Sequence, residues 1–288
     1  MKHKIGIIGH GFVGLAVETG LQTVADIRIH DKYKDTESLE SVVKNSDILF
    51  LCLPTPMNED GSCNISIIEE VLEEIDFIEP GKTIIIKSTV PPGTTKWFSQ
   101  EYKNHAFIFN PEFLTEKNFI QDFLDQDRII LGFASKNNFR IKYDAVIQLY
   151  QDFMKTQRTS AFIFATDSTT AEMTKYIANC FFSTKVIFFN EMKQICDAAE
   201  IDFEDAVKMA ILDPRIGKSH YKVPGPDGKH GFGGSCFPKD INALIVFAEE
   251  NGVDPMLLES VWSKNLLLRE EYEWEKLAQV TGEYKKKE

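Results

Sequence analysis

Short apolar runs rich in β-branched residues recur through the first half of the chain, and several are apolar at every position. Continuous apolar runs are typical of strands in a parallel sheet that is buried on both faces. Between these runs, apolar residues follow helical spacing, as in Val13–Thr23 and Ile65–Ile75. The pattern predicts seven strands, at residues 4–9, 25–31, 47–53, 82–88, 105–110, 128–132 and 161–166.

The alternation of strands and helices predicts an α/β fold in which residues 1–166 form a doubly wound, Rossmann-type parallel sheet. The pattern changes beyond this point. Residues 169–200 contain no Gly or Pro and predict one long helix, whose apolar residues surround much of its circumference near 181–189. Such a helix is expected to be buried against another domain or subunit. Residues 167–288 are expected to form an all-helical central domain, with further helices at 205–212, 238–251 and 255–279.

The composition of the chain is typical of a soluble globular protein. The chain has 288 residues, of which 43% are hydrophobic and 26% charged, as in soluble globular proteins. Its net charge of −12 argues against a nucleic-acid or polybasic membrane surface. No apolar run reaches the roughly 18 to 20 residues of a membrane span, and MKHKIGIIGHGFVG lacks a signal-peptide cleavage pattern.

Five widely spaced cysteines form neither a CxxC pair nor a Cys/His cluster. We therefore expect no disulfide framework and no metal site. A reducing cytoplasm is the compartment that fits best.

The stretch GHGFVG follows the first predicted strand and opens the first predicted helix. Gly9 permits a tight turn, Gly11 lets the backbone approach a pyrophosphate, and Gly14 lets the helix pack closely on the strand. Asp31, at the end of the second strand, would bind the ribose hydroxyls of NAD and repel the extra phosphate of NADP. A glycine turn without a ligand is the alternative, but the strand–turn–helix context favours an NAD site.

Three further segments begin where predicted strands end, namely LPTP (53–56), STVPPGTT (88–95) and NPEFLTE (110–116). In an open α/β sheet, ligands bind outside the carboxyl ends of the strands. Each segment alone is also explained by ordinary turn chemistry. Together they are expected to bring four side chains to one crevice: Thr55, Thr89, Glu112 and Glu116.

The stretch GFGGSCFPKD (231–240) is the second candidate site. Pro238 suits the first turn of a helix, so Cys236 is expected at a helix N-terminus, where the helix dipole and Lys239 favour the thiolate. Asp240 lies one helical turn further and could accept a proton or orient a water. A cysteine is often only a small buried hydrophobe. We expect that role for the other four cysteines and a nucleophile at Cys236.

Lys175 and Asn179 lie one turn apart on the predicted long helix and share a face. Such a pair is usually solvated, but beside a reactive centre it could hold an oxyanion or a water. A thiolate that captures an aldehyde allows a second oxidation to a thioester, and hydrolysis then releases an acid. NAD, an activated cysteine and this pair therefore favour oxidation of an alcohol to an acid in one site.

Seven motifs occur in an order that resembles the UDP-glucose/GDP-mannose dehydrogenase family: GHGFVG, LPTP, IKSTVPPGT, NPEFLTE, the Lys175–Asn179 pair, DPRIG and GFGGSCFPKD. The NPEFL and GGSCFPKD stretches are most similar to the branch that converts UDP-glucose to UDP-glucuronate. The resemblance implies a four-electron oxidation through a thiohemiacetal and a thioester on Cys236. It also implies oxyanion and water binding by Lys175 and Asn179 with Asp240 beside them, a water positioned by Thr89, and thioester hydrolysis assisted by Glu112.

The resemblance further implies a set of binding residues. Those expected to contact the sugar nucleotide are Glu112, Phe113, Leu114, Lys175, Asn179, Arg215, Tyr221, Gly225 and Gly233. Those expected to contact NAD are Gly9, Gly11, Phe12, Val13, Gly14, Asp31, Thr55, Thr89, Glu116 and Lys239. A homodimer is expected, in which Arg215 reaches the neighbouring subunit's substrate.

The chain departs from the resembled family in two ways. Relatives carry a third, nucleotide-binding domain after the helix near which this sequence stops, so a separate chain that supplies this domain is an alternative partner. The stretch between Asp31 and Asp47 is also short, which predicts a more open cofactor mouth. Two other functions stay open: a two-domain β-hydroxyacid dehydrogenase, which needs no cysteine, and a weakly active protein that binds NAD or a sugar nucleotide.

Overall fold

The computed structural model describes residues 2–135 and 139–282. These residues divide into two compact units. The first unit comprises residues up to 55 together with 64–175, and it contains the sheet. The second unit comprises residues 56–63 and the described chain from 176 onward. The boundary at residues 166 and 167 that the sequence suggests stays a prediction.

All seven predicted strands are present in one sheet of order β2-β1-β3-β4-β5-β6-β7. The predicted doubly wound sheet is confirmed, although one neighbouring pair, β5 and β6, is antiparallel. The connection between these two strands contains the NPEFLTE loop and the six-residue helix α5 (Phe119–Leu124), after which the chain runs in the opposite direction. The strands are β1 (His3–Ile8), β2 (Ala25–His30), β3 (Ile48–Leu51), β4 (Thr83–Ile86), β5 (Ala106–Phe109), β6 (Arg128–Phe133) and β7 (Phe162–Asp167).

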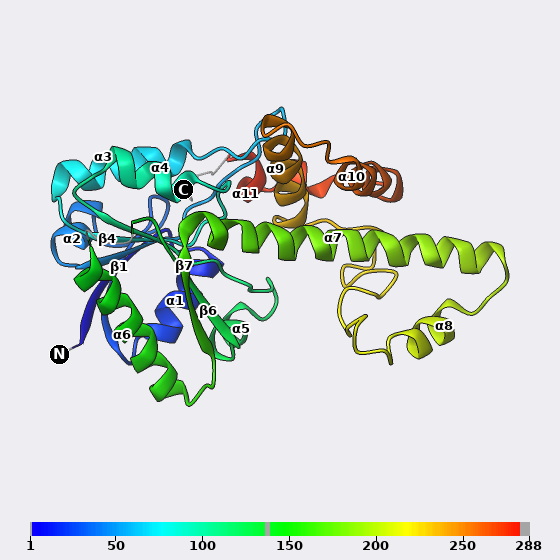
Figure 1. Ribbon diagram of the computed structural model, residues 1–288, viewed down its shortest axis with the longest axis horizontal. Coiled ribbons are helices and arrows are strands. Elements are labelled where there is room, and N and C mark those ends of the chain that lie inside the picture. Colours follow the sequence, from blue (N-terminus) through cyan, green and yellow to red (C-terminus); the bar gives the residue numbers. More distant parts are fainter. Residues whose placement is uncertain (1, 136–138, 283–288) are drawn as a thin grey trace. The chain divides into compact units, whose positions relative to one another are not determined.

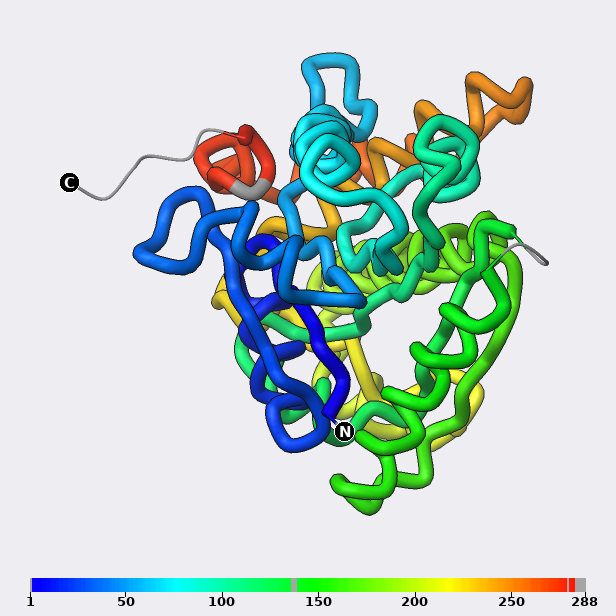
Figure 2. The backbone as a smooth tube through the Cα atoms, turned by 90° about the vertical axis from the view of Figure 1, so that its left-hand side faces the viewer, coloured from blue at the N-terminus to red at the C-terminus, as the bar shows by residue number. Residues whose placement is uncertain are grey.

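Helices cover both faces of the sheet (Figures 1 and 2). Successive strand residues point to opposite faces, so Ile7 packs in the cluster with α1 while its neighbour Ile8 packs in the cluster with α3. This two-sided burial explains why the strands are apolar throughout. One face carries α1 (Phe12–Leu21), α5 and α6 (Arg140–Gln157), and the other carries α2 (Leu39–Lys44), α3 (Ser66–Ile78) and α4 (Thr94–Glu101).

The order of strands reverses at β1, because the chain adds β2 on one side of it and β3 on the other. Ligands of open α/β sheets bind at such a switch point, outside the carboxyl ends of the strands. The glycine turn after β1 and the loop after β3 therefore lie where a ligand is expected.

The predicted long helix is confirmed as α7 (Ser168–Ala198), which begins in the first unit and continues into the second. Its start packs against β6 at Gly132, where an added Cβ would lie 2.5 Å from the Cβ of Ala171 and 2.8 Å from the Cα of Ser168. The side chain of Asp167 accepts a hydrogen bond of 2.9 Å from the Thr170 N–H and so caps the first turn. Glycine in β6 thus allows α7 to begin close to the sheet.

The second unit also contains α8 (Phe203–Ala210), α9 (Phe237–Glu250) and α10 (Met256–Leu268). The predicted helix 255–279 is wrong in length, because the chain leaves the helix at Arg269 and forms only short helical turns at Glu273–Lys276 and Ala278–Thr281. The Arg269 side chain is 1% exposed and pairs with Asp227 at 2.7 Å and with Glu273 at 3.3 Å. The buried guanidinium thus depends on partners that helical periodicity does not reveal. No helix of residues 2–135 and 139–282 is long and apolar enough to cross a bilayer.

Candidate active site

In the glycine turn after β1, backbone conformation and close packing require glycine at two positions. Gly9 has a φ of +90°, and a Cβ on it would lie 2.5 Å from the carbonyl oxygen of Cys52. A Cβ on Gly14 would lie 2.2 Å from the carbonyl oxygen of Gly9. Beside Gly11, in contrast, no described atom other than those of its chain neighbours lies within 4 Å of a Cβ position, and Gly11 itself, at the N-cap of α1, offers no side chain as a cap. The first N–H groups of α1 and the open space beside Gly11 fit a dinucleotide pyrophosphate.

Asp31 lies at the end of β2 and faces the glycine turn. One of its carboxylate oxygens accepts from the His10 N–H at 2.7 Å and the other from the Tyr33 N–H at 2.9 Å. Each oxygen keeps a second acceptor site, so the carboxylate fits the ribose hydroxyls of NAD. The ammonium of Lys34 contacts the carbonyl of His10 from the short β2–α2 connection.

Two other predicted NAD residues lie at the start of α1, after the glycine turn. The ring of Phe12 meets that of Phe119 edge to face with centroids 6.2 Å apart, and Val13 is half-buried.

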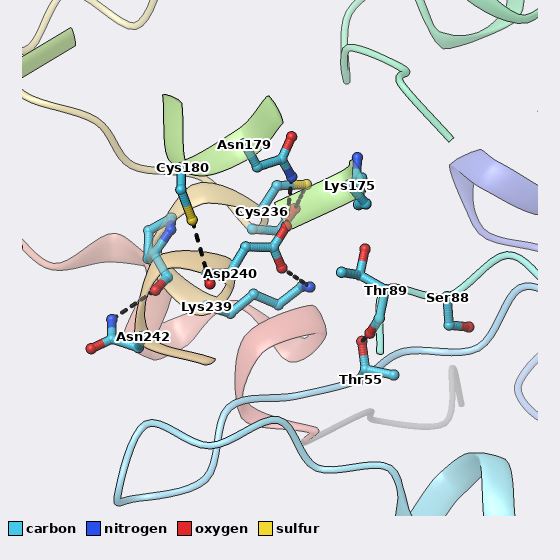
Figure 3. A network of polar contacts seen from close by, with 12 residues as sticks. Thr55, Ser88, Thr89, Lys175, Asn179, Cys180, Cys236, Lys239, Asp240 and Asn242 are labelled. Atoms are coloured by element: carbon cyan, nitrogen blue, oxygen red, sulfur yellow. Dashed lines mark hydrogen bonds and ion pairs between the residues drawn. The ribbon is translucent and has the colours of Figure 1, made fainter. Parts of the chain in front are cut away.

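The loops after β3 and β4 are tied to each other, as Figure 3 shows for Thr55 and Thr89. The Thr55 hydroxyl donates to the Thr89 carbonyl at 2.8 Å, and the Ser88 hydroxyl donates to the Leu53 carbonyl at 2.6 Å. Thr55 and Thr89 are both buried, whereas Glu116 on the loop after β5 is exposed. The structure thus joins two of the three predicted segments directly.

The third segment is held by Lys175 of α7. Its ammonium donates to the carbonyl of Glu112 at 2.7 Å and pairs with the carboxylate of the same residue at 2.9 Å. The second carboxylate oxygen accepts from the Leu114 N–H at 2.8 Å. The ring of Phe113 lies 4.2 Å from the Arg128 guanidinium and 5.5 Å from the Lys175 ammonium. Both members of the Lys175–Glu112 pair are buried.

The charge state of Glu112 follows from its surroundings. Burial by itself raises its pKa, but the Lys175 ammonium, the Leu114 N–H and the Lys87 ammonium outweigh burial and hold the pKa below its usual value. The carboxylate is therefore ionised at neutral pH. Lys87, at the end of β4, donates to the side-chain oxygen of Asn110 at 2.9 Å, and burial lowers the pKa of Lys87 to about 8.

The GFGGSCFPKD stretch places Cys236 at the N-cap of α9, with Pro238 in the first turn, as the sequence predicts. Gly231 and Gly234 have φ values of +69° and +76°. A Cβ on Gly233 would lie 1.8 Å from a carboxylate oxygen of Glu273. The three glycines are thus explained by backbone geometry and by close packing. The Cys236 sulfur is part-exposed and lies 3.7 Å from the Ser235 hydroxyl.

Asp240 organises the polar groups around this cysteine (Figure 3). It is 1% exposed, and its two carboxylate oxygens accept from the Asn179 amide and from the Lys239 ammonium, each at 2.5 Å. Burial lowers the pKa of Lys239, but the charge and hydrogen bond of the Asp240 carboxylate, together with the neighbouring sulfurs of Cys63 and Cys236, outweigh burial and raise it. Lys239 therefore stays charged and favours the thiolate of Cys236.

Two of the other cysteines are held as thiols. Burial raises the pKa of Cys180, whose sulfur lies 3.9 Å from the Asp240 carbonyl, and it raises that of Cys52 to about 12. Neither thiol ionises near neutral pH.

The remaining predicted substrate residues lie on the loop between α8 and α9. Arg215 is exposed and pairs with Asp213 at 2.5 Å. Tyr221 is half-buried and meets Phe189 edge to face at 6.2 Å, and the Gly225 N–H donates to the Lys229 carbonyl at 2.8 Å. Their contacts with a substrate stay predictions.

The structure gathers the predicted residues into two groups, one in each unit. The first lies at the carboxyl edge of the sheet and contains the glycine turn, Asp31, Thr55, Thr89, Glu112 and Lys175. The second lies at the start of α9 and contains Cys236, Lys239, Asp240 and Asn179.

Sequence reasoning missed several polar residues that hold the first group. Lys87 and Asn110 stand inside motifs that it singled out, and the Tyr150 hydroxyl donates to the same Asn110 oxygen at 2.5 Å. Glu172 lies one helical turn before Lys175 on the same face of α7. Its position one turn from Lys175, a candidate catalytic residue, was the sequence signal that could have identified Glu172.

Comparison with known proteins identifies the family of the chain. Residues 15–154 match the family description "UDP-glucose/GDP-mannose dehydrogenase family, NAD binding domain", and residues 169–266 match the central domain of the same family. The chain belongs to this family. NAD is accordingly the cofactor of its N-terminal domain.

The relatives include UDP-glucose 6-dehydrogenases of two bacteria. That of Rickettsia bellii is 36% identical over 241 residues, which cover 82% of this chain and 53% of the relative. That of Pseudomonas aeruginosa is 33% identical over 246 residues, which cover 82% of this chain and 52% of the relative. The chain thus spans about half the length of the curated relatives it matches.

Solved structures share the fold. A UDP-glucose dehydrogenase from Pyrobaculum islandicum has a TM-score of 0.80 and 25% identity, covering 93% of this chain and 68% of that one. A 3-hydroxyisobutyrate dehydrogenase from Mycobacterium tuberculosis has a TM-score of 0.70 at 14% identity, covering 91% of this chain and 92% of that one, and shows likeness of fold alone. Family membership therefore does not favour the β-hydroxyacid dehydrogenase alternative.

We predict that Gly11→Ala weakens NAD binding without destabilising the fold. Its φ of −75° suits any residue, and the added methyl group meets no described atom but occupies the space of the pyrophosphate. NAD affinity, measured by calorimetry, should fall at least about tenfold, or 1.4 kcal/mol, while the midpoint of thermal unfolding stays unchanged. Gly14→Ala is the matched comparison and should lower that midpoint. Unchanged NAD affinity in Gly11→Ala would show that the pyrophosphate binds elsewhere.

We predict that Lys175→Met destabilises the protein in a pH-dependent way. In the native chain, the lowered pKa of Glu112 contributes stability that is present above the ordinary value of 4.5 and is lost as the pH falls through the folded-state value. Without the ammonium, burial dominates, the pKa of Glu112 rises, and stability is lost as the pH rises instead. The loss in free energy of unfolding should be about 3–5 kcal/mol at pH 8 and smaller at pH 5.

Urea unfolding at both pH values measures this difference. The double variant Lys175→Met/Glu112→Gln should recover part of the loss at pH 8, because it removes the unpaired charge. An equal loss at both pH values would contradict the assignment.

Proposed function

We propose that the protein is an NAD-dependent dehydrogenase that oxidises UDP-glucose to UDP-glucuronate by two successive hydride transfers. The observation that carries the proposal is Cys236 at the N-cap of α9, behind three required glycines and beside the Lys239 ammonium. The relatives from Rickettsia bellii and Pseudomonas aeruginosa are UDP-glucose 6-dehydrogenases, which supports UDP-glucose as the substrate. A β-hydroxyacid dehydrogenase needs no cysteine, so that function would not explain why the glycines and the Lys239 ammonium surround Cys236.

NAD, when bound at the glycine turn, supplies the hydride acceptor for both oxidations. Side chains of the protein supply the hydrogen-bond donors, the nucleophile and the base. Lys175 donates two of its three N–H groups to Glu112 and Asn179 donates one of its two to Asp240. Each therefore retains a donor for the substrate oxygen. The hydroxyl loses its proton to water, these donors stabilise the negative charge that develops on the oxygen, and the carbon loses its hydride to give the aldehyde.

The aldehyde that results is the substrate for the thiolate. A C–S bond forms between Cys236 and the aldehyde carbon, and the carbonyl electron pair moves to oxygen, where the remaining donors stabilise the thiohemiacetal oxyanion. Loss of the second hydride from the same carbon converts the adduct to a thioester. No external oxidant beyond two NAD molecules is required.

Hydrolysis of the thioester consumes one water. Glu112, ionised at neutral pH, accepts a proton from that water as it attacks the thioester carbon, and Thr89 positions it. The C–S bond then breaks and the thiolate leaves. Each turnover gives one carboxylate and two NADH.

We also propose that the protein is a homodimer. α7 exposes a stripe of four apolar side chains, each more than half exposed: Ile177, Phe181, Phe188 and Ile195. A stripe of this kind on a long helix is typical of an interaction surface. The exposed Arg215 would then be free to reach a neighbouring subunit. A separate chain that supplies a nucleotide-binding domain is the alternative partner.

We further propose a reducing cytoplasm as the compartment, because it keeps the Cys236 thiol active.

We predict that the purified protein yields two NADH for each UDP-glucose consumed. Cys236→Ala should abolish acid formation, because no thioester forms, while NAD affinity changes less than about twofold, or 0.4 kcal/mol. Absorbance at the NADH band and chromatography of the sugar nucleotide measure both quantities. One NADH per alcohol without dependence on Cys236 would support the hydroxyacid-type alternative, and no reduction with any sugar nucleotide would support a binding protein.

We predict that Phe181→Glu/Phe188→Glu converts the dimer to a monomer, because two buried charges would face each other across the interface. Light scattering coupled to gel filtration measures the mass. Phe77→Glu is the matched control, since Phe77 is 92% exposed on α3 of the other unit, and should leave the dimer intact. A native protein that is monomeric at micromolar concentration would contradict the proposal.

A further inference from the structure

Glu172 of α7 is a fully buried carboxylate that caps a helix far from it in sequence. One of its oxygens accepts from the Gly93 N–H at 2.5 Å and the other from the Thr95 N–H at 2.8 Å. These N–H groups belong to the start of α4, which has no cap from its own Gly93. A carboxylate at a helix N-terminus is stabilised by the helix dipole as well as by the hydrogen bonds.

The loop that ends at α4 is the loop that carries Thr89. At its beginning it is fixed to the loop after β3, through the Thr55 hydroxyl and the Ser88 hydroxyl. At its end, Gly93 turns the chain with a φ of +100° directly into the bonds to Glu172. The backbone on both sides of Thr89 is therefore held by side-chain hydrogen bonds.

Glu172 and Lys175 lie three residues apart and so share one face of α7. The first binds the loop after β4, and the second binds Glu112 in the loop after β5. One turn of one helix thus sets the spacing between Thr89 and Glu112. We propose that Glu172 is a positioning residue, whose carboxylate fixes the Thr89 loop in register with Lys175 and Glu112. Its effect on catalysis rests on the proposed function, whereas its effect on the order of the loop does not.

A side chain that only capped α4 would not need the negative charge of the Glu172 carboxylate. Burial raises the pKa of Glu172 to about 7, opposed by the bonds from Thr95 and Gly93, and the negative charge of Asp167 at the end of β7 raises it further. An ionised carboxylate accepts both bonds, but protonation places a hydrogen on one oxygen, which then becomes a weaker acceptor for the N–H that it faces. The bond to one of the two amides is then weakened, so the order of the loop should follow the ionisation of Glu172 around neutral pH.

Hydrogen exchange of peptides that span residues 89–98 tests the positioning role in the full chain at pH 8. Glu172→Gln keeps the size but presents an amide NH₂ to one backbone N–H, so these amides should exchange about tenfold faster, as expected for loss of one hydrogen bond to a charged group. Glu101→Gln, an exposed residue at the far end of α4, is the matched control and should change nothing. Unchanged exchange in Glu172→Gln would overturn the proposal.

Two further readouts separate positioning from stability and from the proposed function. The thermal midpoint of Glu172→Gln at pH 8 should not fall, because the variant removes a buried charge, while kcat should fall about tenfold. In the native protein, protection of the same amides, corrected for intrinsic exchange, should rise between pH 6 and pH 8; protection independent of pH would overturn the role. A chain without turnover but with this exchange pattern would refute the proposed function and leave the positioning role intact.

Discussion

The buried ion pair between Lys175 and Glu112 is the interaction on which the group of candidate residues at the carboxyl edge of the sheet depends. Neither charge is favourable there alone, because burial disfavours it; the partner, the backbone groups and, for Glu112, the Lys87 ammonium offset burial. The pair joins the start of α7 to the loop after β5. Gly132 makes the pair possible, since it lets α7 begin close to β6.

The helical unit also contains a buried carboxylate, which is held by side-chain donors. Asp240 is more deeply buried than Glu112, and its two oxygens accept from the Asn179 amide and the Lys239 ammonium. These bonds orient both donors. Both oxygens of Glu112 are engaged as well, by the Lys175 ammonium and the Leu114 N–H, so the proposed division of acid–base chemistry and orientation between the two carboxylates rests on the family resemblance.

The sequence was sufficient for the seven strands, the long helix and the glycine turn, because each depends on local periodicity or on backbone conformation. It also placed Cys236 at a helix N-terminus, since Pro238 marks the first turn. It could not reveal the antiparallel β5–β6 pair, the end of α10 at Arg269 or the cap from Glu172. These features depend on partners distant in the chain, and neither spacing nor propensity encodes them.

The central claim is that Cys236 carries the substrate and that Glu112 is needed to release it. Peptide mass spectrometry of Glu112→Gln, quenched after mixing with UDP-glucose and NAD, tests this claim most directly. The account predicts that the peptide containing Cys236 gains the mass of a UDP-glucuronyl thioester, because hydrolysis is slowed. Acid formation at the native rate, with no adduct on Cys236, would contradict it.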